Sequence, residues 1–293
     1  MYHAKAQGKN CMSYFNPEMS TEDELFLRLD QEMRMALANY EFRLYYQPKI
    51  DLKSGDICSV EALMRWVIDK PSGSQFHSMP DEFIPIAEFT GFIVQLDLYA
   101  MDQACWAARQ WELNQNPLPV AVNLSVTLLQ KDNFVELVSK ILEKTQLTAS
   151  LLELEVTESG LMTNVDVNVG KLEKLQKMGV RVAIDDFGTG YSSLSYLKKL
   201  PIDSLKIDRS FISDIESTSD EGSVDVTIVR AIVALGRSLD LNLVAEGVET
   251  ASQMHMVRRM GCHQAQGYLF ARPLPLDELE VLLGNNNEDT KVA

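Results

Sequence analysis

The sequence contains few of the residues on which disulfide frameworks and zinc sites depend. Its 293 residues include only four cysteines and four histidines. The cysteines (Cys11, Cys58, Cys105 and Cys262) show no close pairing and no zinc-knuckle spacing, and the histidines are scattered. This excludes a disulfide-rich fold and a histidine-based zinc site, and it indicates reduced thiols in a cytoplasmic domain.

Long apolar runs are also missing. No stretch of 18 apolar residues occurs without a charge, which predicts that no segment of this chain spans a membrane. The first residues lack the apolar core of a signal peptide. We therefore expect a cytoplasmic domain, and the sequence leaves open whether a longer parent protein is attached to a membrane.

Positive charge is scarce. The chain has 27 Lys and Arg against 42 Asp and Glu, so its formal net charge is −15. Such a chain repels the phosphate backbone, which argues against binding to long nucleic acids. An anionic small substrate fits only where bound cations reverse the local field. A glycine-rich dinucleotide loop is also absent, because Gly188-Thr189-Gly190 matches that motif only in part.

What the chain does have is a regular alternation of strands and helices. Hydrophobic residues make up 46% of it, enough for a sizeable core. Predicted strands are 120–122, 151–154, 180–184, 203–205, 241–245 and 263–265; predicted helices are 95–113, 132–145, 164–178, 191–199, 222–239 and 250–260. This alternation implies a parallel sheet in an α/β protein. With no sign of a second domain, a closed barrel is favoured over an open doubly wound sheet.

The flanking segments are less regular. An amphipathic helix is predicted at 21–40, followed by a hairpin of strands 42–52 and 57–66. A polar loop with Pro71, Gly73 and Pro80 then leads to a short helix at 81–88. A last helix is predicted at 276–283, and the polar tail 285–293 is expected to be disordered.

Polar residues stand where several apolar strands end. They are Glu61, Asn123, Glu155, Asp185, Asp186, Lys206 and Glu246. In a barrel, the carboxyl ends of the strands share one mouth, which would bring these residues together. Ligands that offer only oxygen suit Mg²⁺ or Mn²⁺. Two such ions would offset the crowded negative charge, activate a water and stabilise a leaving oxygen.

Each of these residues also has a plainer interpretation. Asp185 or Asp186 can cap the following helix, and Asn123 can stand in a turn. Glu155 can lie at a solvated strand end, and Lys206 can form an ordinary ion pair. Only their joint placement favours a site. Within that site Lys206 is predicted to orient the attacking water.

Three further groups are candidates. Arg65 is predicted to contact a phosphate, with a surface ion pair as its alternative. Glu158 and Glu249 each follow a predicted ligand by three residues and are predicted to support the site or a neighbouring loop. Gln266 is predicted to contact a base edge or a water. The segment 186–193 is predicted to be a mobile loop, with an ordinary strand-to-helix connection as the alternative.

Over about residues 22–284 the chain resembles the EAL family of cyclic-di-GMP phosphodiesterases. The shared motifs are Gln47-Pro48, Glu61-Ala62-Leu63-Met64-Arg65, Asn123-Leu124-Ser125, Glu155-Val156-Thr157-Glu158, Asp185-Asp186-Phe187-Gly188-Thr189-Gly190, Leu205-Lys206-Ile207-Asp208, Ala245-Glu246-Gly247-Val248-Glu249-Thr250 and Gln266-Gly267-Tyr268. So many motifs in one order make the resemblance specific. It implies a modified TIM (β/α)8 barrel whose first strand is antiparallel to the others, spanning residues 21–284.

The resemblance also implies an activity. Family members hydrolyse cyclic di-GMP to linear pGpG with Mg²⁺ or Mn²⁺, and Ca²⁺ inhibits them. The implied ligands of one ion are Glu61, Asn123, Glu155 and Asp185, and those of the other are Asp185, Asp186 and Glu246. Lys206 would position the water. The residues implied to contact the substrate are Gln47, Leu63 and Arg65.

The resemblance implies more about the chain's context. Glu158 would anchor the loop after Asp186, which borders a homodimer contact in the family. Residues 1–20 resemble the end of a GGDEF domain with a linker, so the chain is expected to be a fragment of a longer signalling protein. Two other functions stay open: a receptor that binds cyclic di-GMP without cleaving it, and a metal-dependent barrel enzyme acting on sugars or enolates.

Overall fold

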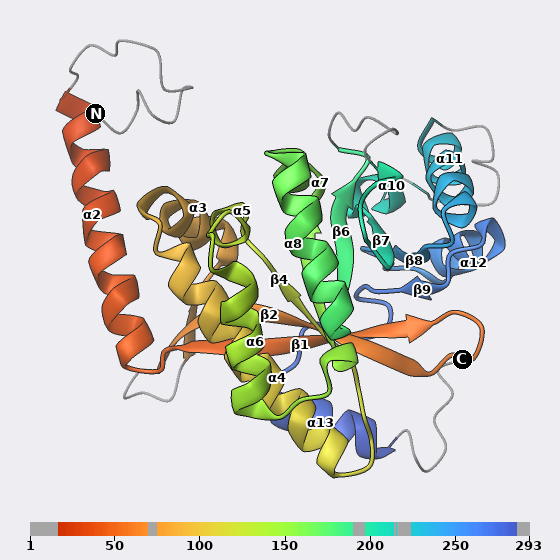
Figure 1. Ribbon diagram of the computed structural model, residues 1–293, viewed down its shortest axis with the longest axis horizontal. Coiled ribbons are helices and arrows are strands. Elements are labelled where there is room, and N and C mark those ends of the chain that lie inside the picture. The colour runs from red at the N-terminus through yellow and green to blue at the C-terminus, as the bar shows by residue number, and fades with distance from the viewer. Residues whose placement is uncertain (1–16, 70–74, 190–196, 214, 216–223, 286–293) are drawn as a thin grey trace. The chain divides into compact units, whose positions relative to one another are not determined.

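The computed structural model describes residues 17–69, 75–189, 197–213, 215 and 224–285 (Figure 1). They form two compact units. Of the described residues, 17–43, 65–69 and 75–96 belong to the smaller unit, and 44–64, 97–189, 197–213, 215 and 224–285 belong to the larger.

The smaller unit contains two helices and the outer end of a hairpin. Its helices are α2 (Pro17–Ala38) and α3 (Pro80–Thr90). The end of β2 (Ile57–Asp69) pairs antiparallel with β3 (Gln75–Ser78) from Trp66 opposite Ser78 to Asp69 opposite Gln75. The rings of Phe42, Trp66 and Phe83 form its aromatic core, with centroids 5.5 to 6.2 Å apart.

Strand β3 corrects the sequence prediction, which placed a loop between Trp66 and Pro80. Four residues are too short for an apolar period to be recognised, and the prolines and glycine nearby favoured a loop. Pro71 and Gly73 lie outside the described residues. Pro80 instead occupies the first turn of α3, where its missing N–H has no helical partner to lose.

The larger unit is a closed barrel. Besides β2, its strands are β1 (Phe42–Asp51), β4 (Val120–Asn123), β5 (Leu152–Thr157), β6 (Arg181–Phe187), β7 (Ser204–Ile207), β8 (Asn242–Ala245) and β9 (Gln264–Ala265). Strand β2 pairs in parallel with β4, and the parallel pairing continues from each strand to the next as far as β9. Strand β1 pairs antiparallel with β9 and also with β2, which closes the ring. The predicted α/β barrel with an antiparallel first strand is confirmed.

Helices connect the parallel strands on the outside of the barrel (Figure 1). They are α4 (Ile93–Leu113), α6 (Phe134–Thr145), α8 (Val165–Met178), α11 (Val224–Ser238) and α12 (Ala251–Met260), while α13 (Leu276–Asn285) follows the last strand. Helix α8 packs on β6, and α11 packs on β7 and β8. On α11 the buried residues Val226, Val229 and Val233 recur at helical spacing, which explains why this helix was predictable.

Several short elements in the connections between the longer strands and helices were not predicted. They are α5 (Val126–Leu129), the 3₁₀ turn Ala149–Leu151, α7 (Glu158–Leu161) and α10 (Arg209–Ser213). Each is too short to show an apolar period. Helix α5 begins where Ser125 accepts a hydrogen bond from the N–H of Leu128, and α7 begins where Thr157 accepts one from Gly160. The helix predicted at 191–199 falls largely outside the described residues.

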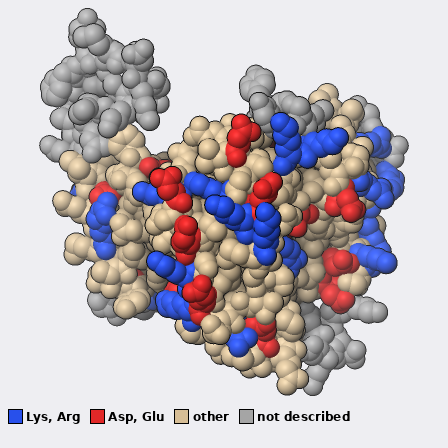
Figure 2. Space-filling model, viewed as in Figure 1, with Lys and Arg blue, Asp and Glu red and all other residues tan. Residues whose placement is uncertain are grey.

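The surface carries both signs of charge. On the face shown in Figure 2, basic and acidic side chains are interspersed, so the net negative charge does not form one continuous acidic patch there. Among the described residues, no single helix has both the length and the apolar character of a membrane span. Helices α3 and α4 meet that criterion only as a bent pair, on length and composition alone.

A glycine between β9 and the following turn gives a test of the barrel rim. A Cβ at Gly267 would lie 2.1 Å from the carbonyl oxygen and 2.3 Å from the nitrogen of Val248. We expect Gly267→Ala to lower the free energy of unfolding by about 3 kcal/mol, because backbone cannot move aside as a side chain can. Denaturant unfolding measures this change.

The matched control is Gly170→Ala within α8, where an added Cβ meets no atom within 4 Å. This substitution should raise the stability by about 0.5–1 kcal/mol, because glycine weakens a helix interior. Equal effects of the two substitutions would contradict the crowding at Gly267.

Candidate active site

A buried lysine lies at the centre of the predicted constellation. Lys206 on β7 is 1% exposed. Its Nζ lies 2.5 Å from Glu155 Oε2, 2.8 Å from Glu246 Oε1, 3.1 Å from Asp185 Oδ1 and 3.5 Å from Glu61 Oε2. Four carboxylates that are distant in sequence therefore surround one ammonium group inside the barrel.

The strands position these side chains in different ways. Asp185 stands near the end of β6, and Glu246 follows β8, as predicted. Glu61 lies within β2, as the predicted strand 57–66 already placed it. Glu155 lies within β5, which corrects the prediction that this strand ends at residue 154. Both are buried on the inner face of the barrel. Strands β2 and β5 extend beyond the apolar runs of the sequence, because a carboxylate can occupy one of the alternate positions that face the barrel interior.

Glu61 is held on both of its oxygens by amide groups. Asn123 Nδ2 donates to Glu61 Oε1 at 2.8 Å, and Gln266 Nε2 donates to Glu61 Oε2 at 2.7 Å. Gln266 Nε2 also donates to Gln47 Oε1 at 2.9 Å, and Gln47 Nε2 donates to the carbonyl of Ala271 at 3.0 Å. The predicted residues Gln47, Glu61, Asn123 and Gln266 thus form one hydrogen-bonded chain across the barrel mouth.

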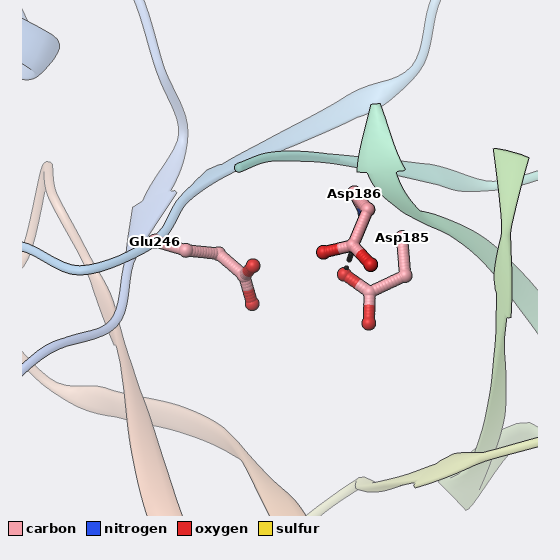
Figure 3. Close-up of side chains that lie close together, drawn as sticks. All are labelled: Asp185, Asp186 and Glu246. Atoms are coloured by element: carbon pink, nitrogen blue, oxygen red, sulfur yellow. Dashed lines mark hydrogen bonds between the residues drawn. The ribbon is translucent and has the colours of Figure 1, made fainter. Parts of the chain in front are cut away.

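Three carboxylates form a candidate cation site. Each of Asp185, Asp186 and Glu246 offers an oxygen within 4.8 Å of the others, and Figure 3 shows the three groups facing a common space. Asp186 adopts a left-handed backbone conformation with φ of 52°, and its N–H donates to Asp185 Oδ1 at 2.9 Å. Such a conformation is uncommon outside glycine. The donors are all oxygens, which fits hard divalent ions.

Electrostatics support the same fit. Burial, followed by the charge of Asp185, raises the pKa of Asp186 to about 6. Burial, followed by the charge of Glu61, raises the pKa of Glu155 to about 7. Burial also raises the pKa of Glu246, against the opposing charge of Lys206. Carboxylates that are reluctant to ionise together form a site that further positive charge would stabilise.

Glu158 and Glu249 have different surroundings. Glu158, the first residue of α7, is 2% exposed, and its Oε2 accepts the N–H of Gly188 at 2.8 Å. It therefore holds the backbone just after Asp186. Glu249 is exposed, and its N–H donates to Gln253 Oε1 ahead of α12. Residues 190–196 lie outside the described chain, so the predicted mobility of segment 186–193 is not tested there.

A pocket of about 250 Å³ opens beside the carboxylates. Its lining residues are Gln47, Glu61, Leu63, Asp186, Asp208, Arg209, Glu246, Gly247, Glu249, Gln266, Gly267 and Tyr268. The predicted substrate residues Gln47, Leu63 and Gln266 are therefore brought together. Arg65 belongs to the smaller unit, and its contact with a phosphate stays a prediction.

Several residues of this region were not singled out from the sequence. Asp208, Arg209 and Tyr268 line the pocket. The Tyr268 ring is 51% exposed, and Arg272 Cζ lies 4.2 Å from its centroid. Lys49 and Glu153 are buried deeper in the barrel. The sequence offered one signal for them: Lys49 lies two residues after Gln47, and Glu153 lies two residues before Glu155. Alternate residues of a strand share a face, so this spacing places them on the same face as the predicted site residues.

The cation site predicts a stabilisation by metal. Mn²⁺ at 100 times its Kd should raise the free energy of unfolding by about 2.7 kcal/mol, because it binds the folded chain alone. Thermal unfolding with and without Mn²⁺ measures this as a rise in Tm. Asp186→Asn should reduce the rise by more than half, because one of three clustered carboxylates is lost.

Glu173→Gln provides the matched control, since Glu173 is an exposed carboxylate on α8. It should retain the full Mn²⁺-dependent rise. An undiminished rise in Asp186→Asn would place the cation elsewhere.

The contact between Glu158 and Gly188 predicts a local effect. Glu158→Ala removes the acceptor of the Gly188 N–H. A buried hydrogen bond to a charged group contributes about 1.5–3 kcal/mol, so hydrogen exchange at Gly188 should accelerate by about tenfold or more. Exchange in α8 should change little, and acceleration throughout the barrel would instead indicate general destabilisation.

Comparisons with known proteins identify similar sequences and folds. The chain is 44% identical over 282 residues to the bifunctional diguanylate cyclase/cyclic di-GMP phosphodiesterase MucR of Pseudomonas aeruginosa, covering 95% of this chain and 40% of MucR. It is 42% identical over 284 residues to the cyclic di-GMP phosphodiesterase NbdA of the same organism, covering 97% of this chain and 35% of NbdA. The chain thus spans less than half the length of these relatives.

Solved structures give the same result. A structure described as the PaMucR phosphodiesterase in complex with c-di-GMP matches with a TM-score of 0.78 and 44% identity, covering 86% of this chain and 99% of that one. The EAL enzyme Bd1971 in its cGMP-bound form matches with a TM-score of 0.80 and 31% identity, covering 90% of this chain and 71% of that one. A family model for the EAL domain matches residues 30–273, and the chain therefore belongs to the EAL family.

Proposed function

We propose that this chain hydrolyses cyclic di-GMP to linear pGpG with the help of two divalent ions. The observation that carries the proposal is the oxygen-donor cluster around Lys206, which has every carboxylate expected of a competent member. The relatives MucR and NbdA are named as cyclic di-GMP phosphodiesterases. The structural match to the c-di-GMP complex extends over nearly all of that chain.

The donor set suggests how two ions would be held. Glu61, Asn123, Glu155 and Asp185 would hold one ion. Asp185, Asp186 and Glu246 would hold the other, with Asp185 shared between the two. When bound, Mg²⁺ or Mn²⁺ supplies Lewis acidity that polarises a phosphate oxygen and lowers the pKa of a coordinated water.

The chain's own residues would do the rest. The carboxylates around Lys206 raise its pKa well above the ordinary value although burial opposes this, so the group is a permanent cation. Its ammonium would hold the attacking water in line with the phosphorus, and its charge would offset charge that develops there. The Gln47–Gln266–Glu61 chain would keep the mouth in one geometry. Tyr268 offers an exposed ring on which a base can stack.

Other predictions extend this proposal. Residues 21–284 would form the phosphodiesterase domain, followed by a tail at 285–293. The segment 1–20 would be the end of a GGDEF-like domain, and residues 1–16 of it lie outside the described chain. Inhibition by Ca²⁺, a homodimer and a cytoplasmic location are also proposed.

Hydrolysis assays test the proposal directly. Purified chain with Mn²⁺ or Mg²⁺ should convert cyclic di-GMP to pGpG, EDTA should stop the reaction, and added Mn²⁺ should restore it. Glu61→Ala should lower kcat/KM by more than about 100-fold, because Glu61 is a proposed ligand and also organises Asn123 and Gln266. Glu173→Gln, which is remote from the cluster, should retain the activity.

Two outcomes would count against catalysis. No turnover at micromolar enzyme would refute the proposal. Tight binding by calorimetry, with intact cyclic di-GMP recovered after hours with Mn²⁺, would favour the receptor instead. Family membership argues against the sugar or enolate enzyme.

A further inference from the structure

A second lysine lies beneath the site. Lys49 on β1 is fully buried, two residues after Gln47. Its Nζ lies 2.6 Å from Glu155 Oε1 and 3.1 Å from Glu153 Oε1. Burial disfavours the charged form, but the carboxylates of Glu155 and Glu153 outweigh this and raise the pKa of Lys49. Lys49 is therefore a fixed internal cation with two carboxylate partners.

Glu153 and Ser204 complete a lower layer of polar side chains. Glu153 precedes Glu155 by two residues on β5, and Ser204 precedes Lys206 by two residues on β7. Alternate residues of a strand share a face, so both point into the barrel. Ser204 Oγ donates to Glu153 Oε2 at 3.0 Å, while Glu153 Oε1 accepts from Lys49 at 3.1 Å. Both oxygens of Glu153 are thus engaged, which holds Lys49 in place.

The lower layer divides the two oxygens of Glu155 between two cations. Oε1 accepts from Lys49 at 2.6 Å, and Oε2 accepts from Lys206 at 2.5 Å. Only Oε2 is directed at the ammonium that Glu246 and Asp185 share. The orientation of Glu155 is consequently set from below, by a residue that contacts none of the other proposed ligands within ion-pair distance in the described chain.

We infer that Lys49 is a positioning residue for Glu155: it holds Oε1 on the inner side of the barrel, so that Oε2 alone is presented to a divalent ion. The inference rests on the proposed role of Glu155 as a ligand. Residues that hydrogen-bond to ligands often change metal affinity by about 10- to 100-fold when they are mutated. In this chain the residue that hydrogen-bonds to the proposed ligand is Lys49, which lies on β1, the antiparallel strand that closes the barrel.

A simpler role for Lys49 would be to balance buried charge. The lower layer allows the two roles to be separated, because Glu153 can be neutralised together with Lys49. Lys49→Met with Glu153→Gln removes one charge of each sign and keeps side chains of similar size. Charge balance is then preserved, but Glu155 Oε1 has lost its donor.

Calorimetric titration with Mn²⁺ in the absence of substrate tests the inference. The double variant Lys49→Met/Glu153→Gln should bind Mn²⁺ about 10- to 100-fold more weakly than the unmodified chain. Glu153→Gln alone keeps the contact between Lys49 and Glu155 and should change the Kd by no more than about threefold. Lys49→Met alone takes the cation away from buried Glu153 and leaves Glu155 with Lys206 as its ion-pair partner. The double variant therefore stands as the test if that single variant does not fold.

Kinetics give a second readout. At saturating Mn²⁺, the double variant should regain a kcat close to that of the unmodified chain, while the Mn²⁺ concentration for half-maximal activity stays raised. An unaltered Kd for Mn²⁺ in the double variant would overturn the inference and leave charge balance as the role of Lys49.

The inference and the proposed function fail in different ways. A chain that binds Mn²⁺ but does not cleave cyclic di-GMP would contradict the proposed function alone. A double variant with unchanged Mn²⁺ affinity would contradict the positioning role alone. A chain that binds no Mn²⁺ at all would overturn both.

Discussion

Repulsion among carboxylates inside the barrel is the constraint that organises this molecule. Glu61, Glu155, Asp185 and Glu246 all come within ion-pair distance of one ammonium, that of Lys206. In an interior of low dielectric constant, so much like charge is costly unless cations are interleaved with it. The lysine tolerates burial because of these carboxylates, and the carboxylates tolerate one another because of the lysine. Breaking either side would leave an uncompensated buried charge.

The barrel is what makes this arrangement possible. Glu155, Asp185 and Lys206 stand on the successive parallel strands β5, β6 and β7. Their side chains converge inside the barrel, where Glu155 and Asp185 lie 2.5 and 3.1 Å from the Lys206 ammonium. Amide groups then saturate Glu61 from both sides without adding charge. Lys49, Glu153 and Ser204 lie two residues along their strands from Gln47, Glu155 and Lys206, respectively. The lower layer therefore comes from the same strands as the site, because alternate residues of a strand point to the same face.

An excess of acids over nearby cations has a chemical meaning. Two ammonium groups, those of Lys206 and Lys49, lie among a larger number of carboxylates. Burial, followed by the charge of a neighbouring carboxylate, raises the pKa values of Asp186 and Glu155. Divalent ions would offset the excess of acids and gain affinity from the same repulsion. Repulsion among the crowded carboxylates therefore favours the binding of hard cations. Such cations can in turn bind and polarise a phosphodiester.

The sequence by itself determined the fold class and most of the site. The helix–strand alternation specified a parallel barrel, because the two hydrophobic periods differ and can be counted along the chain. The acids that follow apolar runs specified a cluster of hard ligands, because strand ends of a barrel converge. Only the tertiary structure decided that Glu155 lies within its strand and that Lys206 stands among four carboxylates. It alone revealed that Lys49 donates a hydrogen bond to Glu155. The contacts of Glu155 with Lys49 and with Lys206 join side chains more than 50 residues apart in sequence, whose distances no local pattern records.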